Sequence, residues 1–90
     1  MRVDLSPEAE DDLARIGDFN LQRSWEWAWK VQHRLSDRMR ALADTPRLGR
    51  PVRGGTFKRY SVTDIQYVID YERLGDGIRV LRIRHAREVR

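Results

Sequence analysis

The sequence contains no cysteine and only two histidines. Without cysteine, the protein has neither a disulfide framework nor a zinc–thiolate site. A small chain that lacks disulfides suits a reducing compartment. Residues 1–13 hold no apolar stretch of the kind found in a signal peptide. No run approaches the roughly 18 apolar residues of a membrane span. We therefore expect a cytoplasmic protein that does not enter a membrane.

Motifs of metal and cofactor chemistry are also missing. Neither His33 nor His85 has a cluster of carboxylates near it in the sequence, so we expect no metal site. Gly54-Gly55 lacks the spacing and the Lys-Ser/Thr pair of a phosphate-binding loop. No motif of Ser/His/Asp hydrolysis is present. The sequence predicts no cofactor.

Acidic residues are scarce in the second half of the chain. Residues 46–90 hold 11 Lys/Arg, ten of them arginine, against 5 Asp/Glu, whereas residues 1–45 hold 7 and 9. Guanidinium groups bind phosphates and carboxylates bidentately, so an arginine-rich half favours an anionic partner such as RNA, DNA or an acidic peptide. A basic surface that is merely solvated is the alternative.

The 90 residues are enough for one domain, which we place at residues 1–90. Its first half is helical by pattern. Ser6-Pro7 is a typical helix start, and the helix is expected to end near Leu21. Ser24 is a second N-cap, for a helix to about Ala43. Its apolar stripe is formed by Ala28, Val31, Leu35, Met39 and Leu42. The short link between the helices predicts an antiparallel hairpin.

Strands are predicted before and after this hairpin. Residues 1–5 alternate apolar and polar, and residues 44–56 form an irregular connection rich in Gly and Pro. Three strands then follow at about Phe57–Val62, Ile65–Glu72 and Ile78–His85, the last two joined by the turn Leu74-Gly75-Asp76-Gly77. The order β-α-α-β-β-β predicts an α+β fold, an antiparallel sheet with a helix hairpin packed on one face.

The last predicted strand has one basic face. Alternation places Leu81 and Ile83 on one side, followed by His85, and Arg82 and Arg84 on the other with Ile78 and Val80. We expect a cluster of cations around the open face of the sheet, suited to an RNA backbone or an acidic protein segment. Its members are Arg53, Lys58, Arg59, Arg82, Arg84, Arg87 and Arg90.

Three tryptophans start the second helix. Trp25 and Trp29 flank its apolar stripe on one side and Trp27 on the other. These rings cover the edges of a small core or form an exposed aromatic patch for a partner. We expect at least one of them to be substantially exposed.

Three motifs carry a resemblance to a known family. Residues 6–13 with Ile16 resemble the L-S-P-x-A-x-x-D-L-x-x-I opening of ParE-like toxins, and residues 42–53 resemble their L-x-x-x-P-x-x-G-R-x-V-R junction. Residues 67–71 and 78–87 resemble their Y-V-I-x-Y and I-x-I-L-R-V-x-H-x-R ending. In this order the motifs are typical of the RelE/ParE superfamily of type II toxin–antitoxin systems.

The resemblance implies the same β-α-α-β-β-β fold and a cognate antitoxin, ParD-like or similar, in a toxin–antitoxin hetero-oligomer. ParE-like members inhibit DNA gyrase, whereas RelE-like members cleave mRNA at the ribosome with basic residues and often a C-terminal Tyr or His. RelE-like enzymes carry an arginine one position after the leading Tyr of the third strand, where this sequence has Val68. No Tyr follows Arg87, so the departures favour the ParE-like branch.

Three functions therefore remain open at this level. The first is a toxin that binds gyrase, with Trp25, Trp29 and the basic cluster contacting the target or the antitoxin. The second is a ribosome-dependent endoribonuclease with His85, Arg87 and Arg59 in its site, because only His85, of the residues around the basic face, offers acid–base chemistry near neutral pH. The third is a module that binds nucleic acid without catalysis.

Overall fold

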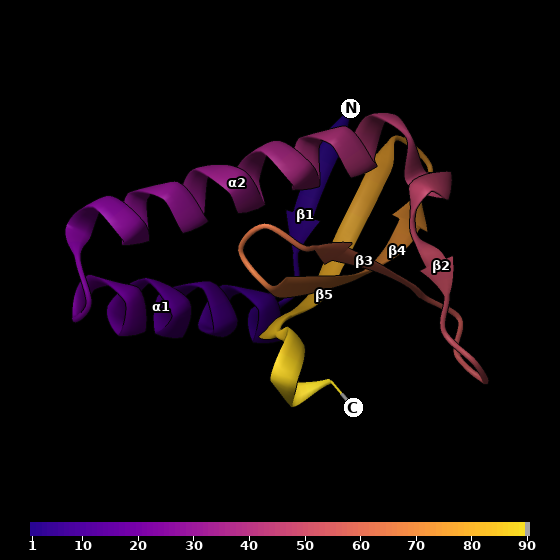
Figure 1. Cartoon of the computed structure of the whole chain (residues 1–90). Helices are drawn as coiled ribbons and strands as arrows, with labels where there is room; N and C mark the ends of the chain where they lie inside the picture. The colour runs from indigo at the N-terminus through magenta and orange to yellow at the C-terminus, as the bar shows by residue number, and fades with distance from the viewer. Residues whose placement is uncertain (90) are drawn as a thin grey trace.

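The computed structural model describes residues 1–89. Five strands and two helices account for most of them (Figure 1). The elements are, in chain order, β1 (Arg2–Leu5), α1 (Pro7–Leu21), α2 (Trp25–Asp44), the 3-10 turn η1 (Pro46–Leu48), β2 (Arg50–Pro51), β3 (Lys58–Val62), β4 (Tyr67–Leu74), β5 (Gly77–His85) and the 3-10 turn η2 (Ala86–Glu88).

Both helices begin at the predicted caps. The hydroxyl of Ser6 accepts a hydrogen bond from the backbone N–H of Ala9 at 3.0 Å, and that of Ser24 accepts one from the N–H of Trp27 at 3.0 Å. Each serine thus satisfies one of the N–H groups that a helix start leaves without a partner. The two helices run side by side as the predicted hairpin (Figure 1).

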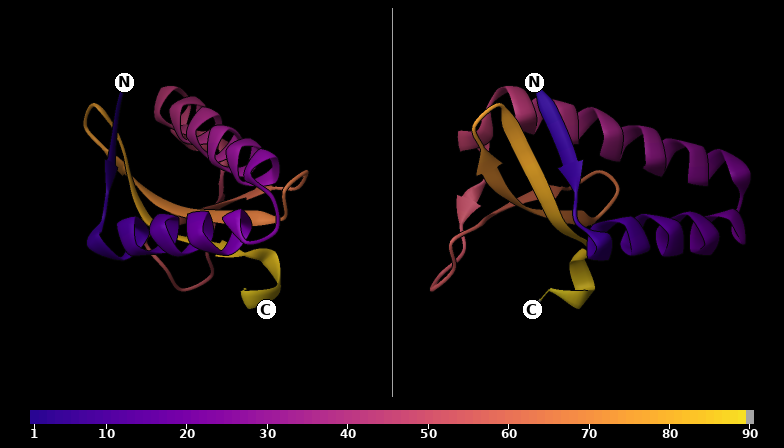
Figure 2. Two further views of the ribbon diagram at one scale, coloured as in Figure 1. Left: turned by 90° about the vertical axis from the view of Figure 1, so that its left-hand side faces the viewer. Right: turned by 180° about the vertical axis from the view of Figure 1, so that it is seen from behind.

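The strands form one sheet in the order β1-β5-β4-β3-β2. The predicted α+β arrangement is confirmed, with the helix hairpin packed against the sheet (Figure 2). The sheet is mixed rather than wholly antiparallel, because β1 runs parallel to β5. Helix α1 directly follows β1, and the chain returns to the sheet only after the whole hairpin, so no tight turn dictates an antiparallel pairing for β1.

The predicted alternation in the last strand was wrong at its centre. Asp70 pairs with Arg82 but Tyr71 pairs with Val80, so Leu81 is an extra residue in β5. Such a bulge shifts the facing of all residues on one side of it. Ile78 and Val80 consequently join Ile83 in the core, fully buried, instead of sharing the face of the arginines.

The turn before β4 also departs from the prediction. The strand starts at Tyr67 rather than at Ile65, which lies buried in the preceding turn. Gln66 has a φ of 60°, in the left-handed region that few non-glycine residues adopt. Its carbonyl accepts a hydrogen bond from the N–H of Ala86 at 2.8 Å, so this turn is tied to the end of β5.

The core lies between α2 and the sheet. Val31, Leu35, Met39 and Leu42 are buried, which confirms the predicted stripe. On β4, the predicted alternation gives a row of buried side chains facing this stripe, namely Tyr67, Ile69 and Tyr71.

Gly77 sets how closely β1 can approach β5. A Cβ at this position would lie 1.8 Å from the carbonyl oxygen of Arg2, whereas a Cβ at Gly75 would meet nothing within 4 Å. We predict that Gly77→Ala lowers the free energy of unfolding by about 1–3 kcal/mol, because β1 must move away from its partner. Gly75→Ala is the matched control and should change it by less than about 0.5 kcal/mol. Urea denaturation measures both, and equal stabilities would contradict the close approach.

Candidate functional site

Three of the predicted arginines lie together on one face of the sheet. Arg59 of β3 and Arg82 of β5 are the register partners of Asp70 on β4. Arg84 lies two residues further along β5. Their face is opposite to the one that carries Ile69 and Tyr71 into the core. Alternation along the strands brings these cations together, as the sequence predicted.

The carboxylate of Asp70 binds two of these guanidinium groups, those of Arg59 and Arg84. Asp70 is only 3% exposed. It accepts hydrogen bonds from Nε and Nη2 of Arg59 at 2.7 and 3.1 Å and from Nη2 of Arg84 at 3.0 Å. Arg59 and Arg84 are therefore held in place by a buried charge, and less of their hydrogen-bonding capacity is left for an external anion.

A second buried carboxylate holds Arg82. Asp12 of α1 is 1% exposed and accepts hydrogen bonds from Nε and Nη2 of Arg82 at 2.8 and 3.1 Å. It also accepts one from Arg15 at 3.0 Å and one from the backbone N–H of Ile83 at 2.9 Å. The side chain of Asp12 thus links α1 both to the side chain of Arg82 and to the backbone of β5.

The sequence reasoning missed both carboxylates as functional residues. For Asp12, the available signal was its place between Ala9 and Ile16 on the buried face of α1, where an unpaired charge is not tolerated. For Asp70, the signal was its position between the apolar residues 67–69 and Tyr71 in a strand that pairs with the arginine-bearing β3 and β5.

His85 lies on the other face of the sheet from these arginines. Its ring contacts the buried ring of Tyr67 edge to face, with centroids 5.4 Å apart. The hydroxyl of Tyr67 accepts a hydrogen bond from the amide of the buried Asn20 at 3.2 Å. The backbone N–H of Arg87 donates to Nδ1 of His85 at 3.2 Å, which fixes the start of η2.

A pocket of about 550 Å³ opens beside His85, between α1, the turn before β4 and η2. Arg15, Arg23 and Arg87 line it as cations, together with the aromatic rings of Phe19 and Trp27. Its carboxylates are engaged, since Asp64 binds Arg34 at 2.7 Å and Glu88 accepts from the N–H of His85 at 3.3 Å. The pocket combines apolar walls with a surplus of positive charge, which suits an acidic, partly apolar ligand.

The structure splits the residues predicted for a nuclease site. His85 and Arg87 line the same pocket, but Arg59 lies on the opposite face, bound to Asp70. Val68, at the position where RelE-like enzymes carry arginine, is buried on the face of Arg84.

The remaining predicted residues among those described lie at the two ends of the molecule. Arg53 belongs to the connection between β2 and β3, and Lys58 to the start of β3. Arg90 lies outside the described residues. Trp25 and Trp29 are 69% and 58% exposed at the hairpin end, which confirms the expectation of an exposed tryptophan. Trp29 stacks on His33 with centroids 3.8 Å apart, whereas Trp27 packs against the core.

Residues 1–89 contain no group of three or more His, Asp or Glu side chains placed to hold a metal ion. Neither helix formed by these residues is both long enough and apolar enough to span a bilayer.

Burial and hydrogen bonding compete at Asp12. Burial alone would raise the pKa of this carboxyl group, but the hydrogen bonds from Arg82, the backbone of Ile83 and Arg15 together hold the pKa below its ordinary value. A lowered pKa in the folded state means that the ionised form favours folding. This contribution is complete above the pKa of the unfolded chain, about 4, and is lost as the pH falls through the lower folded value.

We predict that Asp12→Asn lowers the free energy of unfolding at pH 7 by about 1–3 kcal/mol, because Arg82 loses its charged partner. The difference from the unaltered protein should shrink as the pH falls below about 4, where Asp12 is protonated first in the unfolded chain and, at still lower pH, in the folded protein too. Denaturation at a series of pH values measures this. Asp11→Asn removes the same charge from an exposed position of α1 and is the control. A difference that does not change with pH would argue against an ionised Asp12.

Comparison with known proteins places this geometry in a family. None of the curated proteins matches the sequence at a significant level. A solved chain of the chromosomal ParDE TA system from P. aeruginosa has the same fold, with a TM-score of 0.81, 20% identity, and coverage of 94% of this chain and 95% of that chain. The family model described as ParE toxin of type II toxin-antitoxin system, parDE, matches residues 3–90. Because this match covers nearly the whole sequence, the chain belongs to the ParE toxin family.

Proposed function

We propose that this ParE-family toxin slows growth by binding DNA gyrase in the cytoplasm, and that a cognate, ParD-like antitoxin neutralises it in a hetero-oligomeric complex. The observation that carries the proposal is the match to the ParE toxin model over residues 3–90. The departure of the sequence from RelE-like enzymes at Val68 points in the same direction.

The geometry supports binding over phosphodiester cleavage. Cleavage by general acid–base chemistry needs a proton-transfer group and cations close to the same phosphate. His85 and Arg87 line one pocket on the helix side of the sheet, whereas Arg59, the third residue expected in a nuclease site, lies on the other side and is bound to Asp70. The three residues expected for cleavage therefore do not surround one phosphate.

The hairpin end of the molecule is the surface that best fits a protein partner. The pocket beside His85 offers apolar walls and the cations Arg15, Arg23 and Arg87, and Trp25 and Trp29 are exposed on α2. Protein interfaces are enriched in aromatic residues and arginine. An acidic, amphipathic antitoxin segment would bury its apolar side chains in the pocket and place carboxylates against the cations. The same end is available to the target when the antitoxin is absent.

A paired assay tests the target. The purified toxin is added to a gyrase supercoiling reaction and to translating ribosomes with a defined mRNA. Inhibited supercoiling with intact mRNA is the expected result. Cleavage of the mRNA only on translating ribosomes would replace the gyrase proposal with the endoribonuclease alternative, and inactivity in both assays would remove gyrase as the target.

We predict that Arg87→Ala weakens growth inhibition on induced expression, because this exposed cation borders the pocket and takes part in binding. His85→Gln keeps a hydrogen-bond acceptor for the start of η2 and should leave growth inhibition nearly unchanged. A nuclease that uses His85 for proton transfer would instead lose roughly 10²–10⁴-fold in rate. Arg79→Ala removes the same charge from an exposed position near the start of β5 and is the control. Loss of toxicity in a folded His85→Gln protein would contradict the binding mechanism.

A further inference from the structure

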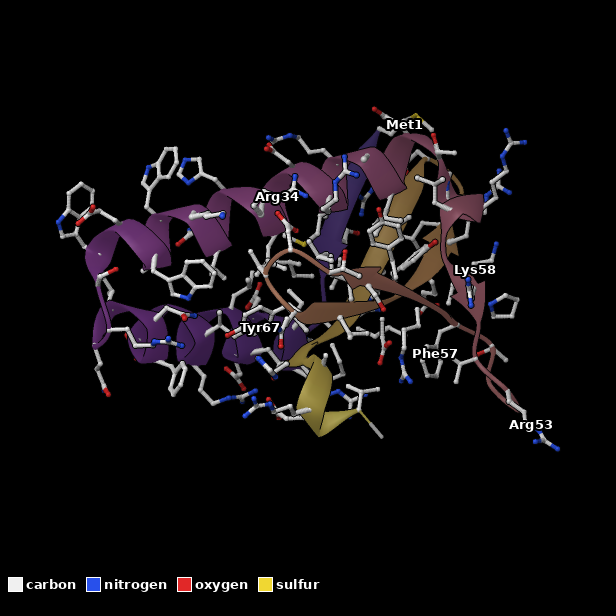
Figure 3. The ribbon with its side chains drawn as sticks, viewed as in Figure 1. Met1, Arg34, Arg53, Phe57, Lys58 and Tyr67 are labelled. Carbon is white, nitrogen blue, oxygen red and sulfur yellow. The ribbon has the colours of Figure 1, made fainter. Side chains whose placement is uncertain are left out.

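Five cations lie at the end of the molecule opposite the hairpin link. They come from η1, β2, the connection between β2 and β3, the start of β3 and the end of β4. We call them the arm cations: Arg47, Arg50, Arg53, Lys58 and Arg73. Arg47, Lys58 and Arg73 line one surface hollow, and Arg50 and Arg53 line another. Figure 3 shows Arg53 at the outer tip of this end and Lys58 near its base.

The arm cations differ from the arginines in the middle of the sheet in how their charges are used. Within residues 1–89, none of the five is within ion-pair distance of a carboxylate, whereas Arg59, Arg82 and Arg84 are held by Asp70 and Asp12. Glu72 is the one carboxylate among the described residues that line the two hollows. This end therefore carries a concentrated positive charge that the protein itself does not neutralise.

The backbone gives this charge a defined shape. Pro51 pairs with Lys58, the N–H of Val52 donates to the carbonyl of Phe57 at 3.0 Å, and the N–H of Gly55 donates to the carbonyl of Val52 at 2.9 Å. Gly54 has a φ of +74°, a conformation that glycine adopts without strain. Residues 50–58 form a hydrogen-bonded arm that projects from the sheet (Figure 1 and Figure 2).

We propose that the arm cations bind the phosphate backbone of duplex DNA. A protein partner would need an apolar patch at the centre of its interface, and of the large apolar side chains that are exposed within residues 1–89 only Leu48 lines either hollow. Single-stranded nucleic acid is held by stacking of its bases on aromatic rings. The strongly exposed rings, Trp25, Trp29 and Phe19, all belong to the helices of the hairpin. Binding to the regularly spaced phosphates of a duplex requires only cations, and the arm cations provide five positive charges.

The choice of DNA over an RNA duplex rests on the proposed function, because gyrase acts on DNA. Contact with phosphates does not depend on that proposal. In this arrangement the toxin holds the DNA with its arm while the hairpin end engages a protein, so a DNA segment near gyrase becomes a second anchor for the inhibitor.

Salt dependence of binding gives a direct test. Each phosphate neutralised by a cation contributes about −0.9 to the slope of log K against log salt concentration on duplex DNA. Five arm contacts predict a slope of roughly −4 to −5 for a labelled 20-base-pair duplex measured by fluorescence anisotropy. The measurement uses no gyrase, so a failure here is separate from a failure of the gyrase proposal.

Two triple variants locate the contacts. The arm variant combines Arg50→Gln, Arg53→Gln and Lys58→Gln. Its slope of log K against log salt concentration should be less steep by about 3, and its binding to DNA at low salt should be weaker on the order of 10²-fold. The triple variant Lys30→Gln, Arg34→Gln and Arg40→Gln removes the same charge from α2 and should keep the slope. If the arm variant does not fold, as judged by circular dichroism, Arg53→Gln alone at the exposed tip should reduce the steepness by about 1.

Several outcomes would overturn the proposal. The first is that the unaltered toxin does not bind DNA at low salt. The second is that both triple variants lose the same amount of DNA affinity. The third is that single-stranded DNA binds as tightly as the duplex or more tightly. An arm variant that still binds DNA but no longer binds an antitoxin would assign the arm to an acidic protein. Tighter binding to an RNA duplex of the same sequence would overturn the choice of DNA.

Discussion

The outer edge of β5 must find hydrogen-bond partners where β1 no longer provides them. Strand β1 accompanies β5 only as far as Val80, and an unpaired edge buried against a helix is costly. Helix α1 closes this edge: Ser6 bonds the carbonyls of Val80 and Leu81, and Asp12 accepts from the N–H of Ile83. Because the carboxylate of Asp12 that closes this edge is buried and charged, it needs a cation beside it. Arg82 is that cation.

This constraint divides the cations of the second half into two groups. Arg59, Arg82 and Arg84 stabilise the fold by neutralising the buried Asp12 and Asp70. The arm cations and Arg87 make no such ion pair within residues 1–89, so the protein does not neutralise their charge. Under the functions proposed above, these unpaired cations serve binding, and the positions of Asp12 and Asp70 decide which arginines stabilise the fold instead.

The two ends of the molecule consequently differ in chemistry. The hairpin end combines exposed tryptophans, an apolar-walled pocket and cations, which matches a protein surface. The arm end gathers five cations that make no ion pair within residues 1–89, which matches phosphates. Under the functions proposed above, a small toxin engages two different macromolecules without the sites overlapping, since the core of α2 and the sheet lies between them (Figure 1).

Local sequence determined the helix starts at Ser6 and Ser24, the buried stripe of α2 and the apolar side of β4, because caps and periodicity depend on residues only a few positions apart. It also determined that Arg82 and Arg84 share a face of β5, because they are two residues apart in one strand. Only the tertiary structure decided what these arginines do, because Asp12 and Arg82 are 70 positions apart in the chain. The bulge at Leu81 and the parallel pairing of β1 likewise depend on register between distant strands, which no local pattern records.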